Sequence, residues 1–427
     1  MITLYCPQVS PRIKYVFEFV FRDVLMVDYI ISSDQIQIKG PVINYSKEKL
    51  NIKNFQIYPT AFLKSTDLNF SNYISYDSKV NHFFEVQKGD LSFDIFSAVF
   101  FLVSRMEEYN LNTYDEHQRY ISENSCLVKL KLEDKPVVDN WCFELLKKVN
   151  NFFNLETKSP KKFKQYCTFD IDNAFAFKNK GLIRNTGSFI KDLFFLRSYK
   201  LRQRFQYLFG VAKDPYDNYY YISEFLKKNN LKSVFFFLLG NYGKMDKNIN
   251  PKNANFKKLI LSISRNNEVG IHPSYNSFNN TNLVSHEISL LKETIYKKIT
   301  QSRYHYLRFS FPKSYQILNR LGIKEDYSMG YSDRVGFRAG TCTPFKFYDL
   351  ENETTTDLKI VPFSYMDGVL NDHLKYSCKS SIEIVRNLKN NVKKVNGEFT
   401  SVWHNESLSN LDRWKGWREV FESTWLD

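Results

Sequence analysis

The sequence lacks closely paired cysteines, long apolar runs and internal repeats, and each absence narrows the class of protein. Its six cysteines are scattered with no Cys-x-x-Cys pair, so neither a disulfide framework nor a zinc knuckle is indicated. No segment reaches the roughly 18 apolar residues of a membrane span, and the amino-terminal segment has no basic start followed by an uninterrupted apolar stretch. We therefore expect a cytoplasmic protein.

Aromatic and basic residues, by contrast, are abundant. Of the 427 residues, 17% are aromatic and 43% hydrophobic, which is typical of folded globular proteins. Lysine and arginine outnumber aspartate and glutamate by 60 to 46, which gives a net charge of +14. No helix-turn-helix, zinc-finger or RNA-recognition pattern accompanies this charge, so we expect no nucleic acid partner.

Two domains are indicated by a change of pattern near residues 150–163, where polar, basic and Pro residues cluster in "NNFFNLETKSPKKF". Residues 1–155 have the pattern of a small mixed α/β domain of unknown function. Residues 160–427 alternate strand and helix patterns, which is typical of an α/β fold with a parallel sheet or a (β/α) barrel. The expected strands are 164–169, 232–239, 267–272, 303–309, 326–331, 358–366 and 398–406.

Two aspartates follow the first of these strands, in the segment "TFDIDNAFAF". Asp170 and Asp172 are two residues apart, so in a strand their carboxylates would point the same way. Such a pair of like charges is best tolerated where a cation, a proton or a reaction needs it. The alternative is a solvated turn that simply ends the strand.

Other potential ligands also stand at the ends of expected strands. In parallel α/β folds the reactive groups gather at the carboxyl ends of the strands, so these side chains should converge with the two aspartates. They are His272, His305, Arg308 and His404.

Aspartate and histidine together favour a first-row metal ion, with Zn²⁺ the simplest choice, and metal-assisted hydrolysis. His82 and His117 lie in the first domain and are assigned no role.

Five segments of residues 160–427 resemble, in order, the motifs of the polysaccharide deacetylase, or NodB-homology, superfamily. They are "TFDIDNAFAF", "GIHPSYNS", "RYHYLRFSFPKSYQILNRLGIKEDYSMGY", "GFRAGTCTPF" and "SVWHNESL". The segments "FDIFSAVFFLVSRMEEY", "DEHQRY" and "PVVDNW" resemble the extra amino-terminal domain of a Bacteroidetes-type branch. The resemblance implies a distorted (β/α)7 barrel that removes an acetyl group from an N-acetylated sugar with one divalent metal ion.

The resemblance also implies catalytic roles. Asp170 matches the general base, and Arg308 matches the arginine that steadies it. His404 matches the general acid that protonates the departing amine. Asp326 corresponds to the acid that orients and charges this histidine.

The metal ligands implied by the resemblance are Asp172 and His272, but the family's second metal histidine is missing. It would follow four residues after the first, where this chain has Asn276. An amide oxygen is a poorer Zn²⁺ ligand than imidazole. Three outcomes stay open: a two-ligand site with extra waters, a site completed by another group such as His305 or Ser277, or a barrel that has lost its metal.

Two residues are substrate-binding candidates. Arg338 is flanked by glycines in "GFRAGTC", and Tyr275 belongs to "HPSYN". The alternative for Arg338 is a surface ion pair. Trp403, next to His404 on the opposite face of its strand, is expected in the core rather than under a sugar.

Residues 181–210 interrupt the barrel pattern with a basic stretch in which lysines and arginines alternate with Phe and Leu. As an amphipathic element it could contact an anionic membrane or a lipid-linked, phosphate-bearing sugar. The alternative is a helical insertion that packs its apolar residues on the barrel and exposes its charges to water.

The sequence therefore leaves two functions open. The first is a metal-dependent deacetylase that acts on a sugar precursor of a surface polysaccharide. This sugar is free, lipid-linked or nucleotide-linked. The second is a non-catalytic carbohydrate-binding or scaffold protein with a degraded metal site, and Asn276 is the residue that favours it.

Overall fold

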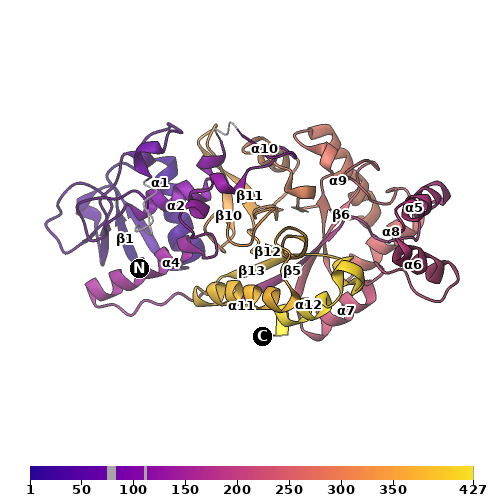
Figure 1. The fold of residues 1–427 in the computed structure, drawn as a ribbon. Helices are drawn as coiled ribbons and strands as arrows, with labels where there is room; N and C mark the ends of the chain where they lie inside the picture. Colours follow the sequence, from indigo (N-terminus) through magenta and orange to yellow (C-terminus); the bar gives the residue numbers. More distant parts are fainter. Residues whose placement is uncertain (75–82, 110–112, 427) are drawn as a thin grey trace.

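The computed structural model describes residues 1–74, 83–109 and 113–426, which form two sheets with helices packed on them (Figure 1). The smaller sheet has four parallel strands in the order β2-β1-β3-β4. Its strands are β1 (Ile2–Tyr5), β2 (Tyr29–Ser32), β3 (Val42–Asn44) and β4 (Phe55–Gln56).

Four helices accompany the small sheet. Ser10 caps the first one by accepting a hydrogen bond from the backbone N–H of Ile13, and Pro11 occupies its first turn. Asp94 caps the second in the same way, and every residue of that helix is buried. The helices are α1 (Pro11–Phe17), α2 (Ile95–Val103), α3 (Cys126–Lys129) and α4 (Val137–Phe153).

The larger sheet has nine strands in the order β10-β11-β9-β8-β7-β6-β5-β13-β12. All neighbours are parallel except β10 and β11, so the chain is a mixed α/β protein with largely parallel sheets, as the sequence predicts. The strands are β5 (Lys164–Ile171), β6 (Lys232–Leu238), β7 (Glu268–His272), β8 (Gln301–Ser302), β9 (Glu325–Asp326), β10 (Phe345–Asp349), β11 (Thr354–Ile360), β12 (Tyr365–Met366) and β13 (Glu398–His404).

One segment connects the two sides of this sheet. Val361, just after β11, donates its backbone N–H to the Asp326 carbonyl of β9 at 2.8 Å. Ser364, just before β12, donates to the Thr400 carbonyl of β13 at 2.8 Å. The sheet therefore curls until the chain from β11 to β12 contacts both β9 and β13.

Helices cover the outer face of the curled sheet. Phe169 of β5 contacts Phe421 of α12, and Phe237 of β6 contacts Phe256 of α8. Trp403 is buried against Phe421, as expected for a core residue. The helices of residues 160–427 are α5 (Leu182–Phe194), α6 (Ser198–Leu208), α7 (Tyr219–Lys228), α8 (Ala254–Ile263), α9 (Thr281–Ile295), α10 (Lys313–Arg320), α11 (Cys378–Lys394) and α12 (Trp417–Leu426), of which α5 and α6 lie at the end of the molecule (Figure 1).

None of the helices in the described part of the chain combines the length and apolar character that crossing a membrane requires.

The strands expected at 303–309 and 326–331 differ from those observed. Only Gln301–Ser302 and Glu325–Asp326 pair in the sheet. After β8 the chain forms a 3-10 turn, in which Tyr306 and Leu307 have left-handed φ angles of 60° and 51°. The alternating apolar pattern of "RYHYLRF" therefore belongs to a loop over the carboxyl end of the sheet.

The two regions meet through buried ion pairs. Glu108 accepts hydrogen bonds from Arg105 at 2.8 Å and from Arg338 at 2.5 Å, and all three side chains are at most 5% exposed. α4 ends at Phe153 and β5 begins at Lys164. We retain residues 1–155 and 160–427 as the proposed domains.

Candidate metal and active site

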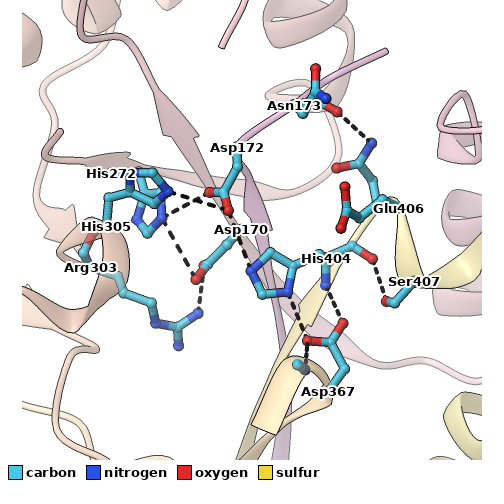
Figure 2. Close-up of polar contacts among 12 residues, drawn as sticks. Asp170, Asp172, Asn173, His272, Arg303, His305, Asp367, His404, Glu406 and Ser407 are labelled. Atoms are coloured by element: carbon cyan, nitrogen blue, oxygen red, sulfur yellow. Dashed lines mark hydrogen bonds and ion pairs between the residues drawn. The ribbon is translucent and has the colours of Figure 1, made fainter. Parts of the chain in front are cut away.

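Several polar side chains converge at the carboxyl end of the parallel strands (Figure 2). Asp170 lies near the end of β5 and Asp172 follows directly after it. His272 is the last residue of β7, and His404 is the last residue of β13. The close-up shows Asp172 between these two histidines.

Three of the converging side chains form a cluster that could hold a metal ion. The ligand atoms of Asp172, His272 and His305 all lie within 4.8 Å of one another. The Nε2 atom of His272 is 3.1 Å from Asp172 Oδ1, and that of His305 is 3.5 Å from Asp172 Oδ2. One carboxylate and two imidazoles are the donor set of many protein sites for Zn²⁺ and related ions.

Outer partners orient both imidazoles of the cluster. His272 Nδ1 lies 2.5 Å from the Arg303 carbonyl, so it carries a proton, and His305 Nδ1 lies 2.8 Å from Asp246 Oδ1. In the neutral rings the Nε2 lone pairs therefore face Asp172, as in metal sites with an oriented second shell. Asp172 Oδ1 is a buried atom without a hydrogen-bond partner among the described residues. A cation bound between the Asp172 carboxylate and the two Nε2 atoms would give each of these groups a partner, so the residues fit a metal ion.

The charge of the cluster is reflected in its pKa values. Burial acts to raise the pKa of Asp172, but the His305 and His272 imidazoles hold it well below its usual range. Burial acts to lower the pKa of His305, yet Asp172 and Asp246 raise it to about 9. The site is thus a place where carboxylates and cationic groups stabilise one another.

The second aspartate, Asp170, is held by an arginine. Arg303 donates from Nη1 to Asp170 Oδ1 at 2.8 Å and from Nε to the Tyr327 carbonyl at 2.9 Å. Its guanidinium is fully buried and lies 4.7 Å from the ring centroid of Phe236. The other Asp170 oxygen, Oδ2, lies 3.8 Å from His272 Nε2, next to the cluster.

On the other side of Asp172 stands a histidine with its own carboxylate. His404 Nδ1 lies 2.7 Å from Asp367 Oδ1, and the backbone N–H of His404 donates to Asp367 Oδ2 at 2.7 Å. Burial acts to lower the pKa of His404, but Asp367, with Asp172 and Asp170, raises it well above the usual histidine value. His404 Nε2 lies 3.5 Å from Asp172 Oδ2.

Arg308 and Asp326 lie elsewhere than the sequence analysis expects. Arg308 donates to the backbone carbonyls of His117 and Tyr275, because the loop after β8 turns it away from β5, and Arg303 contacts Asp170 instead. Asp326 accepts from the Ser302 hydroxyl at 2.7 Å and from Ser328, while Asp367 contacts His404. Arg303, not Arg308, therefore contacts Asp170, and Asp367, not Asp326, contacts His404.

Arg338 and Asn276 are also placed outside the site. Arg338 is buried against Glu108 rather than lining a cleft. Asn276 lines a pocket of about 240 Å³ with Glu287 and His286, and Asp172, His272 and His305 are not among the residues that line it. His305 occupies the third position of the cluster instead.

The amino-terminal region contributes to the rim beside His305. His117 Nδ1 lies 3.1 Å from the Tyr275 hydroxyl, and Arg119 donates to the Tyr306 carbonyl at 2.9 Å. The ring of Tyr306 contacts that of His305, with 4.7 Å between centroids. His117 was assigned no role from the sequence, and His82 lies outside the described residues.

Arg303 and Asp367 are each the first residue after an observed strand, β8 and β12. The strand-end rule would have selected both if the strand boundaries had been known.

Comparisons with known proteins find one family model that matches the amino-terminal region and several solved structures of low similarity. Residues 2–154 match a family of unknown function, DUF7033. No curated protein matches the chain in sequence.

Three solved structures resemble the chain at low identity. A protein assigned as a polysaccharide deacetylase from Mycobacterium smegmatis is 17% identical, with 64% of this chain and 87% of that one covered at a TM-score of 0.40. A polysaccharide deacetylase from Bacillus cereus is 14% identical, with 60% and 88% covered and a TM-score of 0.28. A mutant of a CE4 family pseudoenzyme with restored enzymatic activity is 13% identical, with 60% and 70% covered and a TM-score of 0.25. At such TM-scores the matches carry no weight for the site, whose chemistry rests on its own residues.

Proposed function

We propose that this chain is a metal-dependent hydrolase of the polysaccharide deacetylase type, which removes the N-acetyl group of a sugar precursor of a surface polysaccharide. The observation that carries the proposal is the Asp172–His272–His305 cluster, flanked by Asp170 on one side and His404 on the other. We propose that the curled sheet is a distorted (β/α)7 barrel, and that the reaction occurs in the cytoplasm, where the free, mostly buried thiols stay reduced.

Asp172, His272 and His305 would hold one divalent ion, and we propose Zn²⁺ because two imidazoles and a carboxylate suit it. Such an ion supplies Lewis acidity, which lowers the pKa of water and polarises a carbonyl group. Arg303 and Asp246 keep the two Nε2 atoms directed at Asp172.

Asp170 is proposed as the general base. Arg303 holds Oδ1, which leaves Oδ2 on the side of the cluster. When water adds to the acetamide carbonyl carbon, Oδ2 accepts the proton that the water loses. Because the buried Arg303 guanidinium donates to Oδ1, the carboxylate is held in one orientation before the reaction.

His404 is proposed as the general acid. Its raised pKa keeps the imidazole protonated near neutral pH, and Asp367 fixes the ring through Nδ1. As the C–N bond breaks, Nε2 delivers its proton to the sugar nitrogen, and the products are the free amine and acetate. The 19% exposure of the His404 side chain puts this proton at the mouth of the site.

The alternative of a non-catalytic barrel depended on Asn276. His305 offers a third ligand group beside Asp172 and His272 whatever Asn276 contacts, and the proposed proton-transfer groups Asp170 and His404 lie next to them. This combination supports the enzyme over the scaffold protein.

The test is acetate release from N-acetylated chitooligosaccharides by Zn²⁺-loaded protein. We expect Asp170→Asn and His404→Gln each to lower kcat by about 100- to 10,000-fold, as loss of a general base or acid does. Asn276→Ala serves as the matched control and should keep its activity. Release that is unchanged in Asp170→Asn would contradict the assignment.

A further inference from the structure

The α5–α6 hairpin turns its apolar side chains toward solvent, which is the reverse of an ordinary surface insertion. Of the 24 large apolar side chains that are exposed in the described part of the chain, ten belong to residues 190–211. Phe194 is 80% exposed, Leu196 84% and Phe209 77%. These ten side chains are not packed on the barrel as the alternative from the sequence expects, whereas Tyr207 of α6 contacts Phe177.

The polar face of the same hairpin looks inward onto a cleft of about 1270 Å³. The cleft extends from Asn173, next to the candidate ligand Asp172, to the loop after β13. Eight cationic side chains line it, against the two carboxylates of Asp192 and Asp412. The cations are Lys180, Arg184, Lys191, Arg197, Lys200, Arg204, Lys247 and Arg413.

Several of these cations have no acidic partner. Arg197 and Arg204 both share Asp192, whereas Lys180, Lys191 and Lys200 form no ion pair with any described residue. Burial and the neighbouring Arg184 lower the pKa of Lys180 to about 7, and an anion bound in the cleft would favour its charged form. A cleft with this excess of positive charge is suited to an anionic group.

Polar contacts hold the hairpin against the barrel. Arg184 donates to the Asn248 carbonyl at 2.8 Å, and Asn185 donates to the Phe177 carbonyl at 3.1 Å. Arg204 of α6 pairs with Asp192 of α5 at 3.2 Å. These contacts fix the α5–α6 hairpin in place. Its exposed apolar face therefore lies at the end of the molecule opposite the amino-terminal region (Figure 1).

We propose that the α5–α6 hairpin docks on an anionic lipid bilayer through its apolar face, and that the cleft behind it receives the phosphate group of a lipid-linked sugar. Exposed Phe and Leu beside Lys and Arg are the chemistry of helices that lie in the membrane interface. The second half rests on the proposed deacetylase function. Together they put the sugar between the bilayer and the metal cluster.

Docking is tested by sedimentation of the full chain with vesicles of phosphatidylcholine, with and without phosphatidylglycerol. We expect binding to the anionic vesicles that weakens with salt. The triple variant Phe194→Ser, Phe195→Ser, Leu196→Ser should bind at least about tenfold more weakly, since three exposed apolar groups are lost. The control, Ile36→Ser with Tyr296→Ser, removes apolar groups that are 92% and 85% exposed elsewhere and should bind normally.

Equal vesicle binding by the triple variant, or no binding by the unmodified chain, would overturn the docking proposal. Self-association in the absence of lipid that the triple variant abolishes would also overturn it, because a second copy would then cover the apolar face.

The phosphate site is tested by calorimetry with N-acetylglucosamine 1-phosphate and N-acetylglucosamine. We expect the phosphorylated sugar to bind at least about tenfold more tightly, and this preference to disappear in Lys191→Glu with Lys200→Glu. The control, Lys258→Glu with Lys379→Glu, makes the same charge change at exposed positions and should keep the preference.

An absent preference in the unmodified chain, or one that survives in the cleft variant, would overturn the phosphate site. Because no turnover is measured, this result is independent of acetate release, so failure of the deacetylase proposal would be seen separately.

Discussion

In each imidazole of the Asp172 cluster, the contact that Nδ1 makes with an outer partner fixes the orientation of the ring. The Arg303 carbonyl holds His272 and the Asp246 carboxylate holds His305, so both rings direct Nε2 toward the same carboxylate. Arg303 has a second role, because its side chain also holds Asp170. A single residue thus aligns one proposed ligand through its backbone and the proposed base through its guanidinium.

The third ligand can be tested by two substitutions. We expect His305→Ala to weaken Zn²⁺ binding by more than the roughly 10- to 100-fold that loss of an outer partner costs, because a direct ligand is lost. Asn276→Ala should bind about one ion with unchanged affinity, since Asn276 lies in a separate pocket. Competition with a chromogenic chelator measures both. The reverse pattern would move the site to Asn276.

The strand-end rule selects five residues of the candidate site from the sequence. Asp170, Asp172, His272 and His404 stand at the ends of observed strands, whereas His305 lies in the turn after β8. Arg303 and Asp367 obey the same rule, but the rule needs strand boundaries to within a residue. Asp246 stands in a loop eight residues beyond β6, and nothing local in the sequence indicates its contact with His305.

At the scale of elements, the strands β8 and β9 are short and are joined by a buried carboxylate. Asp326 of β9 accepts from the Ser302 hydroxyl of β8 at 2.7 Å and from the Ser328 N–H at 2.9 Å. The sequence overestimates both strands because "RYHYLRF" and "DYSMGY" alternate apolar and polar residues as a strand does. The left-handed φ values of Tyr306 and Leu307 have no signature in that alternation.

Asp326 should make stability depend on pH. Burial raises its pKa from 3.8 to about 6, so the folded state favours the protonated acid. Its contribution is present in full below about pH 4 and is lost as pH rises through 6. The loss is on the order of 3 kcal/mol, from a rise of about two pKa units at 1.36 kcal/mol each.

Urea unfolding of the native protein and of Asp326→Asn at pH 4.5 and 7.5 measures this dependence. Relative to the variant, the native protein should be less stable at the higher pH. Asp357→Asn, at a side chain that is 81% exposed, serves as the control and should show no such difference. Parallel behaviour of all three proteins would show that Asp326 does not titrate in this range.

At the scale of the whole molecule, the amino-terminal region and the region of the nine-stranded sheet share a buried interface. Glu108 lies between Arg105 of its own region and Arg338 of the other, and the attraction of Glu108 raises the pKa of Arg338 although burial opposes it. Thr341 and Thr343, also of the second region, likewise donate to Asp139 of α4. The change of pattern near residues 150–163 predicts two regions, but the partner of Arg338 could be found only in the three-dimensional structure.

Removal of Glu108 should destabilise the chain as a unit. We expect Glu108→Ala to lower the free energy of unfolding by about 3–5 kcal/mol, because Arg338 would be left as an unpaired buried charge. Glu123→Ala breaks an exposed pair with Arg334, with 64% of the glutamate side chain accessible, and should cost at most about 1 kcal/mol. Urea unfolding followed by circular dichroism distinguishes the two. Equal effects would mean that the Glu108 pair is solvated.

The contacts of His117 with Tyr275, and of Arg119 with Tyr306, have a consequence for how this molecule can change over time. Substitutions in residues 115–119 would alter the wall of the site next to His305 without changing any proposed metal ligand or proton-transfer group. In the proposed deacetylase, selectivity for one sugar over another would then change while the proposed hydrolytic chemistry stays constant. Sugar selectivity and hydrolytic chemistry would then depend on different segments of the chain.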